Sequence, residues 1–350
     1  MNLILILSTF ILLYLITFFC EIFTNAVENL GKYFKIDDGA LGSIFAAVGT
    51  ALPETILPLI AVFGAYVSGN ELNLGKDIGR GAVLGSPFLL STLAFFAVGI
   101  TILVMSALRK RIDIVCIDLK YFQRDLRYFL TAYTSGVIAA LIPVYSVKII
   151  IGIILLSFYF YYAVKTVKKY SCNDDDDCGE ENNEETDRLK FMKFFGISDK
   201  FFLQILIVQL LISVAGLVLS SHFFVENLKE ISALFGISAM IVSLFLAPVA
   251  TELPETYNGI LWSIKKKDVL AVSNISGAMV FQACIPMSVG IFFTDWSFNE
   301  EAVVNVIMVY TALIILFAGT FKSKCFTSKL FLLSGIPYFL YLLFSFLNFR

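Results

Sequence analysis

The sequence has few of the residues on which many catalytic and metal sites depend. A single histidine, His222, occurs among 350 residues, which argues against a histidine-based metal site or acid–base pair. The six cysteines are scattered and form no convincing disulfide framework. No HExxH, paired-aspartate or Ser/His signature falls within an apolar run. We therefore expect no enzymatic activity and no bound cofactor.

Apolar residues are abundant instead. They make up 58% of the chain, with 35 phenylalanines and a mean hydropathy of +0.84. A soluble protein of this size cannot keep so much apolar surface away from water, so the solvent must be largely lipid. Runs long enough to cross about 30 Å of hydrocarbon predict an all-α integral membrane protein with about ten transmembrane helices. These runs fall at roughly 3–20, 40–67, 82–108, 128–146, 147–165, 201–220, 234–263, 269–293, 302–321 and 329–348.

The basic residues are distributed unevenly between alternate loops. If the N-terminus lies outside, the loops after the odd-numbered spans carry 21 of the 26 Lys and Arg residues, and the remaining segments carry 5. By the positive-inside rule, both termini are extracytoplasmic in a multi-pass protein of the cell membrane. The same rule makes 166–200 a cytoplasmic linker between two five-helix halves, 1–165 and 201–350.

One stretch occurs twice, as AAVGTALPET at 46–55 and as APVATELPET at 247–256, with seven of ten positions identical. An odd number of spans in each half makes the two copies enter the membrane in opposite directions. This pattern is typical of the inverted repeats of secondary transporters, whose substrate sites lie near the midplane. Chance similarity between two apolar segments is the alternative interpretation.

Each copy of this stretch places a proline and a glutamate inside an apolar run. Proline lacks an N–H group, so a carbonyl four residues earlier loses its helical partner, and such a carbonyl needs protein or water around it. Carbonyl, hydroxyl and carboxylate oxygens suit Ca²⁺, Na⁺ or Mg²⁺. The stretch therefore predicts a cation site made by Gly49, Thr50 and Glu54 in one half and Ala250, Thr251 and Glu255 in the other.

Two alternatives apply to these residues. The prolines could be simple kinks and the glutamates could pair with basic residues, although no Lys or Arg lies near the middle of a predicted span. An intramembrane acid is otherwise a functional-site hypothesis by default. The following spans offer Ser86, Asn274 and Gln282 as further donors, but polar residues in membrane helices also serve as contacts between helices.

The repeated stretch resembles the α-repeats of the cation/calcium antiporter superfamily, which includes the sodium/calcium exchangers. That family reads roughly G-T-S-L-P-E and then G-N-x-x-G-S-N-x-F-N/D in each repeat. Residues 49–54 and 250–255 match the first part, and 81–90 and 273–282 match the second part loosely. The resemblance implies two inverted repeats and alternating-access exchange of a divalent cation, Ca²⁺ first, for Na⁺ or H⁺. The implied partners are inorganic cations and the lipid bilayer, with no nucleic acid.

Three of the chain's departures from this pattern change the donor groups of the predicted site. Leu90 stands where the family has an asparagine, Gln282 replaces the corresponding acid or amide, and Glu252 adds a carboxylate where the family has serine. Glu252 and Glu255 are three residues apart and would be neighbours on one helical face. Three carboxylates would repel one another. We therefore hypothesise a preference for another divalent ion, such as Mg²⁺, or coupling to protons. A receptor or scaffold that binds ions without transporting them is the rival interpretation.

The linker contains nine acidic residues between 172 and 187. Part of it fits a calcium-binding loop template, with Asp174, Asp176, Gly179 and Glu185 at positions 1, 3, 6 and 12. Position 5 is Cys178, and no periodic helices flank the segment. A solvated, disordered linker is the favoured interpretation, and a weak regulatory cation site is the alternative.

Overall fold

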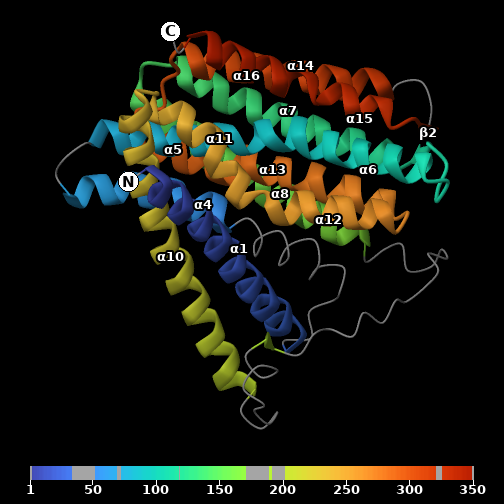
Figure 1. Ribbon diagram of the computed structural model, residues 1–350, viewed down its shortest axis with the longest axis horizontal. Coiled ribbons are helices and arrows are strands. Elements are labelled where there is room, and N and C mark those ends of the chain that lie inside the picture. Colours follow the sequence, from blue (N-terminus) through green and yellow to red (C-terminus); the bar gives the residue numbers. More distant parts are fainter. Residues whose placement is uncertain are drawn as a thin grey trace.

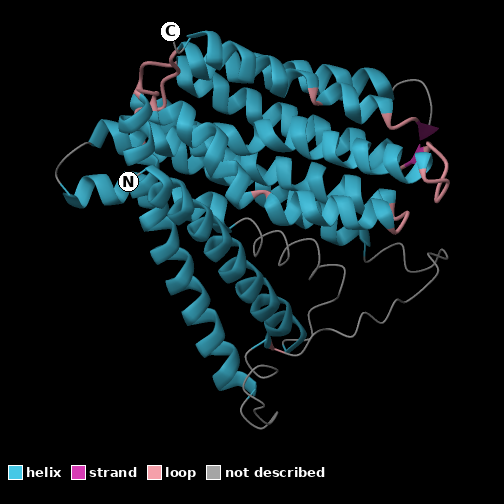
Figure 2. Cartoon of the chain, viewed as in Figure 1, coloured by secondary structure: helices cyan, strands magenta, loops and turns pink. Residues whose placement is uncertain are grey.

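The chain folds into a bundle of helices, and nearly all of its regular structure is helical (Figures 1 and 2). The computed structural model describes residues 2–33, 52–68, 72–117, 119–170, 189–190, 202–320 and 325–348. The first half contains α1 (Asn2–Tyr33), α4 (Leu52–Ser68), α5 (Leu72–Leu89), the π-helix η2 (Leu90–Ala94), α6 (Phe95–Ala107), α7 (Leu119–Leu141) and α8 (Tyr145–Tyr170). The second half contains α10 (Phe202–Phe235), α11 (Ala239–Thr251), α12 (Leu253–Ile264), α13 (Asp268–Phe293), α14 (Glu300–Thr320), α15 (Lys329–Ser334) and α16 (Ile336–Asn348).

Several of these helices are long and apolar enough to cross a membrane. Among the described residues, six segments meet this condition: Ile4–Phe23, Asn73–Ala107, Tyr145–Thr166, Phe202–Phe235, Ala271–Phe293 and Glu300–Thr320. Three shorter apolar stretches accompany them, at Glu54–Gly64, Ala239–Val249 and Lys329–Ser345. The all-helical membrane architecture agrees with the sequence, whereas the count of ten spans and their inversion remain predictions.

Some helix boundaries differ from those expected. α1 and α10 extend well past the expected spans 3–20 and 201–220, and α7 begins nine residues before 128. The expected single span 234–263 is interrupted at Glu252, which lies between α11 and α12 with φ −92° and ψ 0°. The cause is Pro254, which occupies the first turn of α12. Proline is tolerated there but breaks the hydrogen-bond ladder of a helix interior.

α1 and α10 form an antiparallel pair that projects away from the other helices (Figure 1). Near one end, the Asn227 amide of α10 donates to the Thr9 hydroxyl of α1 over 3.1 Å. Near the other end, the Gln209 amide donates to the Asn25 side-chain oxygen over 3.0 Å. Interhelical hydrogen bonds of this kind contribute about 0.6–2 kcal/mol each in membranes. The pair packs against α4, which begins within the first repeated stretch, and against α11, which ends within the second.

α5 and α11 approach each other closely because two glycines face the crossing. A Cβ atom on Gly81 would lie 2.4 Å from the carbonyl oxygen of Met240, and one on Gly85 would lie 2.4 Å from that of Leu244. The spacing of four residues puts both glycines on one helical face. Small residues let membrane helices approach to backbone contact. This crossing brings the end of α11 next to Ser86 of α5.

α13 lies in the middle of the bundle and packs against α4, α5, α7, α8 and α12 (Figure 1). Its side chains contribute to the largest apolar core, for example Ile275, Met279, Ala283 and Met287, all of them fully buried. A short antiparallel strand pair, β1 (Val115–Cys116) with β2 (Cys325–Phe326), joins the loop after α6 to the segment before α15. α13 is thus placed to carry side chains toward several neighbouring helices at once.

Candidate cation site

Three carboxylates from different parts of the chain meet inside the bundle. One oxygen atom from each of Glu54, Glu252 and Glu255 can be chosen so that all three lie within 4.8 Å of one another. Glu54 belongs to α4, Glu252 lies at the α11–α12 break, and Glu255 is in the first turn of α12. Their exposed fractions are 3%, 0% and 2%. The two repeated stretches therefore converge on one buried acidic centre.

The break between α11 and α12 sets the geometry of two of these acids. The Glu252 N–H donates to the Pro248 carbonyl over 2.8 Å and so completes α11. The Glu252 carbonyl accepts from the Thr256 N–H over 3.0 Å and so begins α12. Glu255 then lies at the N-terminal end of a helix, where the helix dipole favours negative charge. Glu252 and Glu255 remain close together, as expected, but across a break and not on one continuous helix.

Several oxygen atoms around this centre have no hydrogen-bond partner among the described residues. They include both carboxylate oxygens of Glu54, the second carboxylate oxygen of Glu252, the Thr251 hydroxyl and the side-chain oxygen of Gln282. Leaving such groups unpaired and buried costs free energy, and buried charges in proteins are otherwise paired or coordinate metals. None of the ion pairs found in the described part of the chain includes Glu54 or Glu252. Hard oxygen donors arranged in this way can bind a cation.

Two residues predicted from the second motif contact Glu252. The Gln282 amide of α13 donates a hydrogen bond to one Glu252 carboxylate oxygen. The Ser86 hydroxyl of α5 also interacts with this carboxylate. Asn274 is different, because its amide donates to the backbone carbonyl of Glu255 over 3.2 Å. Gln282 and Ser86 thus face the acidic centre, whereas Asn274 contacts the backbone beside it.

The remaining predicted residues have mixed outcomes. Thr251 is 2% exposed at the end of α11, next to Glu252, and Ala250 precedes it in the same helix. Gly49 and Thr50 lie outside the described residues, as do residues 171–188 and 191–200 of the acidic linker, which include its calcium-loop template. The roles of all these residues in cation binding remain predictions.

A π-helical turn, η2, follows Ser86 in the same span. Pro87 is part of α5 just before it. Leu90 is fully buried in η2, at a position where the family that the sequence resembles has an amide. The Ser91 and Thr92 hydroxyls both donate to the Phe88 carbonyl. π-helical turns inside α-helices are frequent at functional sites. Position 90 is therefore apolar and part of the buried core, and the two hydroxyls that follow it donate to the backbone.

A further buried acid, Asp125 of α7, which is 4% exposed, was not predicted from the sequence. Its carboxylate pairs with Arg124 at 2.9 Å and accepts hydrogen bonds of 3.1 Å from Tyr162 of α8 and Ser276 of α13. Asp125 lies in the loop that we predicted between the spans 82–108 and 128–146. A signal was available, because Phe122, Leu126 and Phe129 continue the apolar periodicity of α7 back to Leu119. This acid is fully partnered and joins three helices.

The chain is similar in sequence and in fold to known membrane proteins. The sequence model of the family described as sodium/calcium exchanger protein matches residues 4–168 and 205–349. The chain is 25% identical to an uncharacterized membrane protein of Methanocaldococcus jannaschii over 315 residues, which are 89% of this chain and 88% of that protein.

Solved structures show the same fold. The H⁺/Ca²⁺ exchanger CAX superposes with a TM-score of 0.72 at 13% identity, covering 97% of this chain and 82% of that one. A sodium-calcium exchanger structure, NCX_Mj, superposes with a TM-score of 0.57 at 18% identity, covering 98% and 99%.

Proposed function

Since the chain belongs to the sodium/calcium exchanger protein family, we propose that it is a secondary antiporter exchanging a divalent cation, Ca²⁺ above others, for Na⁺ or H⁺. The family and the structural neighbours are transporters and not enzymes. The observation that carries the proposal is the buried centre of Glu54, Glu252 and Glu255, whose oxygen atoms lie within 4.8 Å of one another.

The donor set favours a divalent cation. Three carboxylates carry up to three negative charges in a buried place, where the attraction for a cation is much less screened than in water. Glu54, Glu252 and Glu255 supply the charges, and Thr251, Ser86 and Gln282 supply neutral oxygens. Ca²⁺ accepts six to eight oxygen ligands in flexible geometry, whereas Mg²⁺ demands a near-ideal octahedron. Mg²⁺ is the alternative cargo for an exchanger of the same fold, because the additional Glu252 carboxylate increases the negative charge of the site.

The proposed architecture has ten spans in two inverted five-helix repeats, with both termini outside and the 166–200 linker inside. The two ranges that match the family, 4–168 and 205–349, support a division near this linker. Contacts between loops support the sidedness. β1 pairs with β2, and Arg111 pairs with Asp268. Arg111, β1 and β2 lie in loops whose basic residues predict the cytoplasmic side, and Asp268 directly follows another such loop. On the opposite side, Lys76 pairs with Asp295, as expected of two extracytoplasmic loops.

Transport follows from the cost of moving the empty site. A cation bound by protein oxygens loses its hydration shell, and the carboxylates lose their mutual repulsion. Exposing uncompensated carboxylates to the membrane interior is costly. The empty site therefore switches only slowly between facing the outside and facing the cytoplasm. Each switch requires a bound divalent ion, Na⁺ or H⁺. Coupling of the two fluxes comes from this penalty.

Ion flux in proteoliposomes tests the proposal. Purified protein is reconstituted, and ⁴⁵Ca²⁺ uptake is measured with an outward Na⁺ gradient, with an outward H⁺ gradient and with neither. We expect uptake with one of the gradients and none in Glu54→Ala or Glu255→Ala. Glu226→Ala is the matched control, because the Glu226 side chain of α10 is half exposed, pairs with Lys229 and is not one of the three buried acids.

Three outcomes decide between the candidate functions. Gradient-driven uptake that survives both Glu54→Ala and Glu255→Ala would refute the site. Binding of Ca²⁺ to the purified protein without flux under any gradient would instead support the non-transporting ion-binding protein. Uptake of Mg²⁺ that outcompetes Ca²⁺ would identify the other cargo.

A further inference from the structure

Arg111, in the turn after α6, makes the most buried ion pair of the described residues. Its guanidinium donates to both oxygens of Asp268, over 2.8 Å from Nη1 and 2.6 Å from Nη2. The exposed fractions of the two side chains are 6% and 10%. Two parallel N–H···O bonds fix the relative orientation of the partners as well as their distance. The pair therefore acts as a rigid connection.

The same guanidinium contacts two further segments. Nη1 donates to the Ser263 carbonyl over 2.9 Å, and Nη2 donates to the Ile114 carbonyl over 3.0 Å. Ser263 is in the last turn of α12, whose carbonyl groups have no partner within the helix. Asp268 is the first residue of α13. One side chain thus joins the turn after α6 to the end of α12 and the start of α13.

Both helices joined by Arg111 lead directly to the acidic centre. α12 carries Glu255 in its first turn, eight residues before Ser263, which corresponds to about 12 Å along a helix. α13 carries Gln282, the hydrogen-bond donor to Glu252. A short helix moves as a rigid body, so a shift at its C-terminal end also moves the carboxylate at its other end. The position of Glu255 relative to Gln282 consequently depends on the α12–α13 turn.

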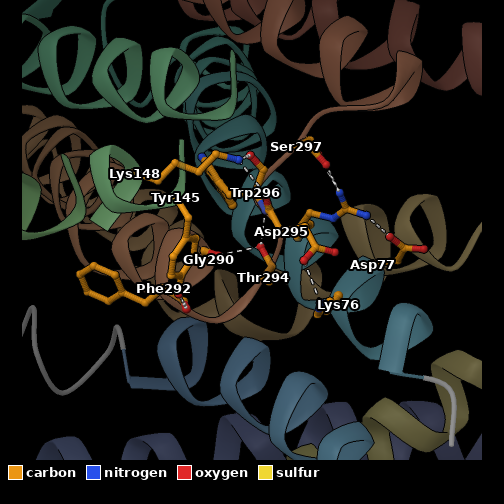
Figure 3. Close-up of polar contacts among 11 residues, drawn as sticks. Lys76, Asp77, Tyr145, Lys148, Gly290, Phe292, Thr294, Asp295, Trp296 and Ser297 are labelled. Carbon is orange, nitrogen blue, oxygen red and sulfur yellow. Dashed lines mark hydrogen bonds and ion pairs between the residues drawn. The ribbon is translucent and has the colours of Figure 1, made fainter. Parts of the chain in front are cut away.

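A related contact lies at the opposite end of the bundle, between the start of α5 and the loop after α13 (Figure 3). Lys76 pairs with Asp295 at 2.8 Å, and Arg80 donates to the Ser297 carbonyl over 2.6 Å. Lys148 donates to the carbonyls of Asp295 and Trp296. The Asp295 side chain is 64% exposed, so its pair with Lys76 is screened by water. This pair offers a matched, weak counterpart to Arg111–Asp268.

We propose that Arg111 is a positioning residue for the cation site, which holds the ends of α12 and α13 so that Glu255 and the Gln282–Glu252 pair meet around one ion. The inference rests on the proposed function, because it concerns the same site. Arg111 does not touch the carboxylate oxygens that would bind the ion. Its effect on cation affinity would act through the backbone of two helices.

Calorimetric titration of the purified protein with Ca²⁺ tests this role, together with thermal unfolding of the ion-free protein. Outer residues that orient metal ligands typically contribute about 10- to 100-fold in metal affinity, and we expect a weakening of this size in Arg111→Ala and Asp268→Asn. Arg111→Lys keeps the charge but lacks the planar fork, so it should restore affinity only in part. The double variant Arg111→Asp with Asp268→Arg should also recover part of it. Lys76→Ala, the matched control, should bind Ca²⁺ like the unmodified protein.

The two measurements separate positioning from general stabilisation. A merely structural role would lower the unfolding temperature and leave the Ca²⁺ affinity of the folded fraction unchanged, and that result in Arg111→Lys and Asp268→Asn would overturn the proposal. Glu54→Ala distinguishes failure of the inference from failure of the proposed function. If Glu54→Ala does not bind Ca²⁺ while Arg111→Ala binds it normally, only the positioning role is wrong. If Glu54→Ala binds normally, the cation site itself is wrong.

Discussion

The side-chain amide of Gln282 donates a hydrogen bond to the carboxylate of Glu252, which lies thirty residues earlier at the α11–α12 break. The contact holds one oxygen of Glu252 and leaves the second oxygen without a partner in the described part of the chain. It also turns the Gln282 amide N–H toward the acid, so only its carbonyl oxygen is left to face an ion. Gln282 therefore orients an acidic ligand in addition to any contact of its own.

Replacing Gln282 by glutamate should make stability depend more strongly on divalent ions. The variant would place a fourth carboxylate beside Glu252, and like charges at this distance repel. We expect a lower unfolding temperature than the unmodified protein in EDTA, and a larger increase on addition of Ca²⁺. Thermal unfolding in detergent measures both values. An equal Ca²⁺-induced increase in the two proteins would contradict the placement of Gln282 at the site.

Glu252→Ser removes one of the three carboxylates and restores the serine of the resembling family. The total charge of the acidic side chains falls by one, so we expect Ca²⁺ affinity to fall about tenfold or more, which corresponds to 1.4 kcal/mol. The preference between Na⁺ and H⁺ gradients should change as well. Competition of Mg²⁺ against ⁴⁵Ca²⁺ and flux under each gradient measure these effects. Sodium-driven Ca²⁺ uptake that is identical in the variant and the unmodified protein would contradict a special role for Glu252.

Gly85→Ala should be strongly destabilising, whereas the corresponding change in the second half, Gly277→Ala, should be tolerated. A Cβ on Gly85 would lie 2.4 Å from the Leu244 carbonyl oxygen, and backbone cannot move aside cheaply. The nearest atom to a Cβ on Gly277 is the Tyr162 hydroxyl oxygen, at 3.9 Å. Overpacking costs about 1–3 kcal/mol, and Ala gains up to about 1 kcal/mol over Gly in a helix. Unfolding temperatures of the two variants should therefore move in opposite directions.

Ca²⁺ should stabilise the folded protein by mass action. At a free concentration of 100 times the dissociation constant, a ligand of the folded state adds about 2.7 kcal/mol to the free energy of unfolding. The increase in unfolding temperature should disappear in Glu54→Gln, which removes one charge with little change in volume. Glu226→Gln should keep the full increase. A Ca²⁺ response that persists in Glu54→Gln would place the stabilising site elsewhere.

Asp125→Ala should lower stability without removing the Ca²⁺ response. The change removes the acceptor of the Tyr162 hydroxyl and the ion-pair partner of Arg124, and it leaves Ser276 only a long bond of 3.4 Å to the Ser273 carbonyl. Each unsatisfied buried group costs about 1–3 kcal/mol. Asp125 accepts from residues of α8 and α13, so its loss weakens a three-helix junction. Unfolding temperatures with and without Ca²⁺ should both decrease by similar amounts. Loss of the Ca²⁺ response alone would instead make Asp125 part of the ion pathway.

The sequence alone determined the class of protein and the principal acids. Long apolar runs leave no alternative to a membrane environment, because lipid is the only solvent that accommodates them. The repeated LPET stretch singled out Glu54 and Glu255, since proline and glutamate are both costly in an apolar helix and need a specific reason to recur. Glu252 could be recognised because the family has serine at this position. These signals are local, so they can be read along the chain.

Only the tertiary structure decided how the residues meet. The donation from Gln282 and the burial of Asp125 depend on which helical faces come together. The partners in these contacts are 30 to 151 residues apart in sequence. The Arg111–Asp268 connection spans 157 residues, and from the sequence Arg111 was one basic residue among several in a loop. Composition and periodicity indicate which side of a helix is apolar. Which side chains meet across two helices depends on the packing of the whole bundle.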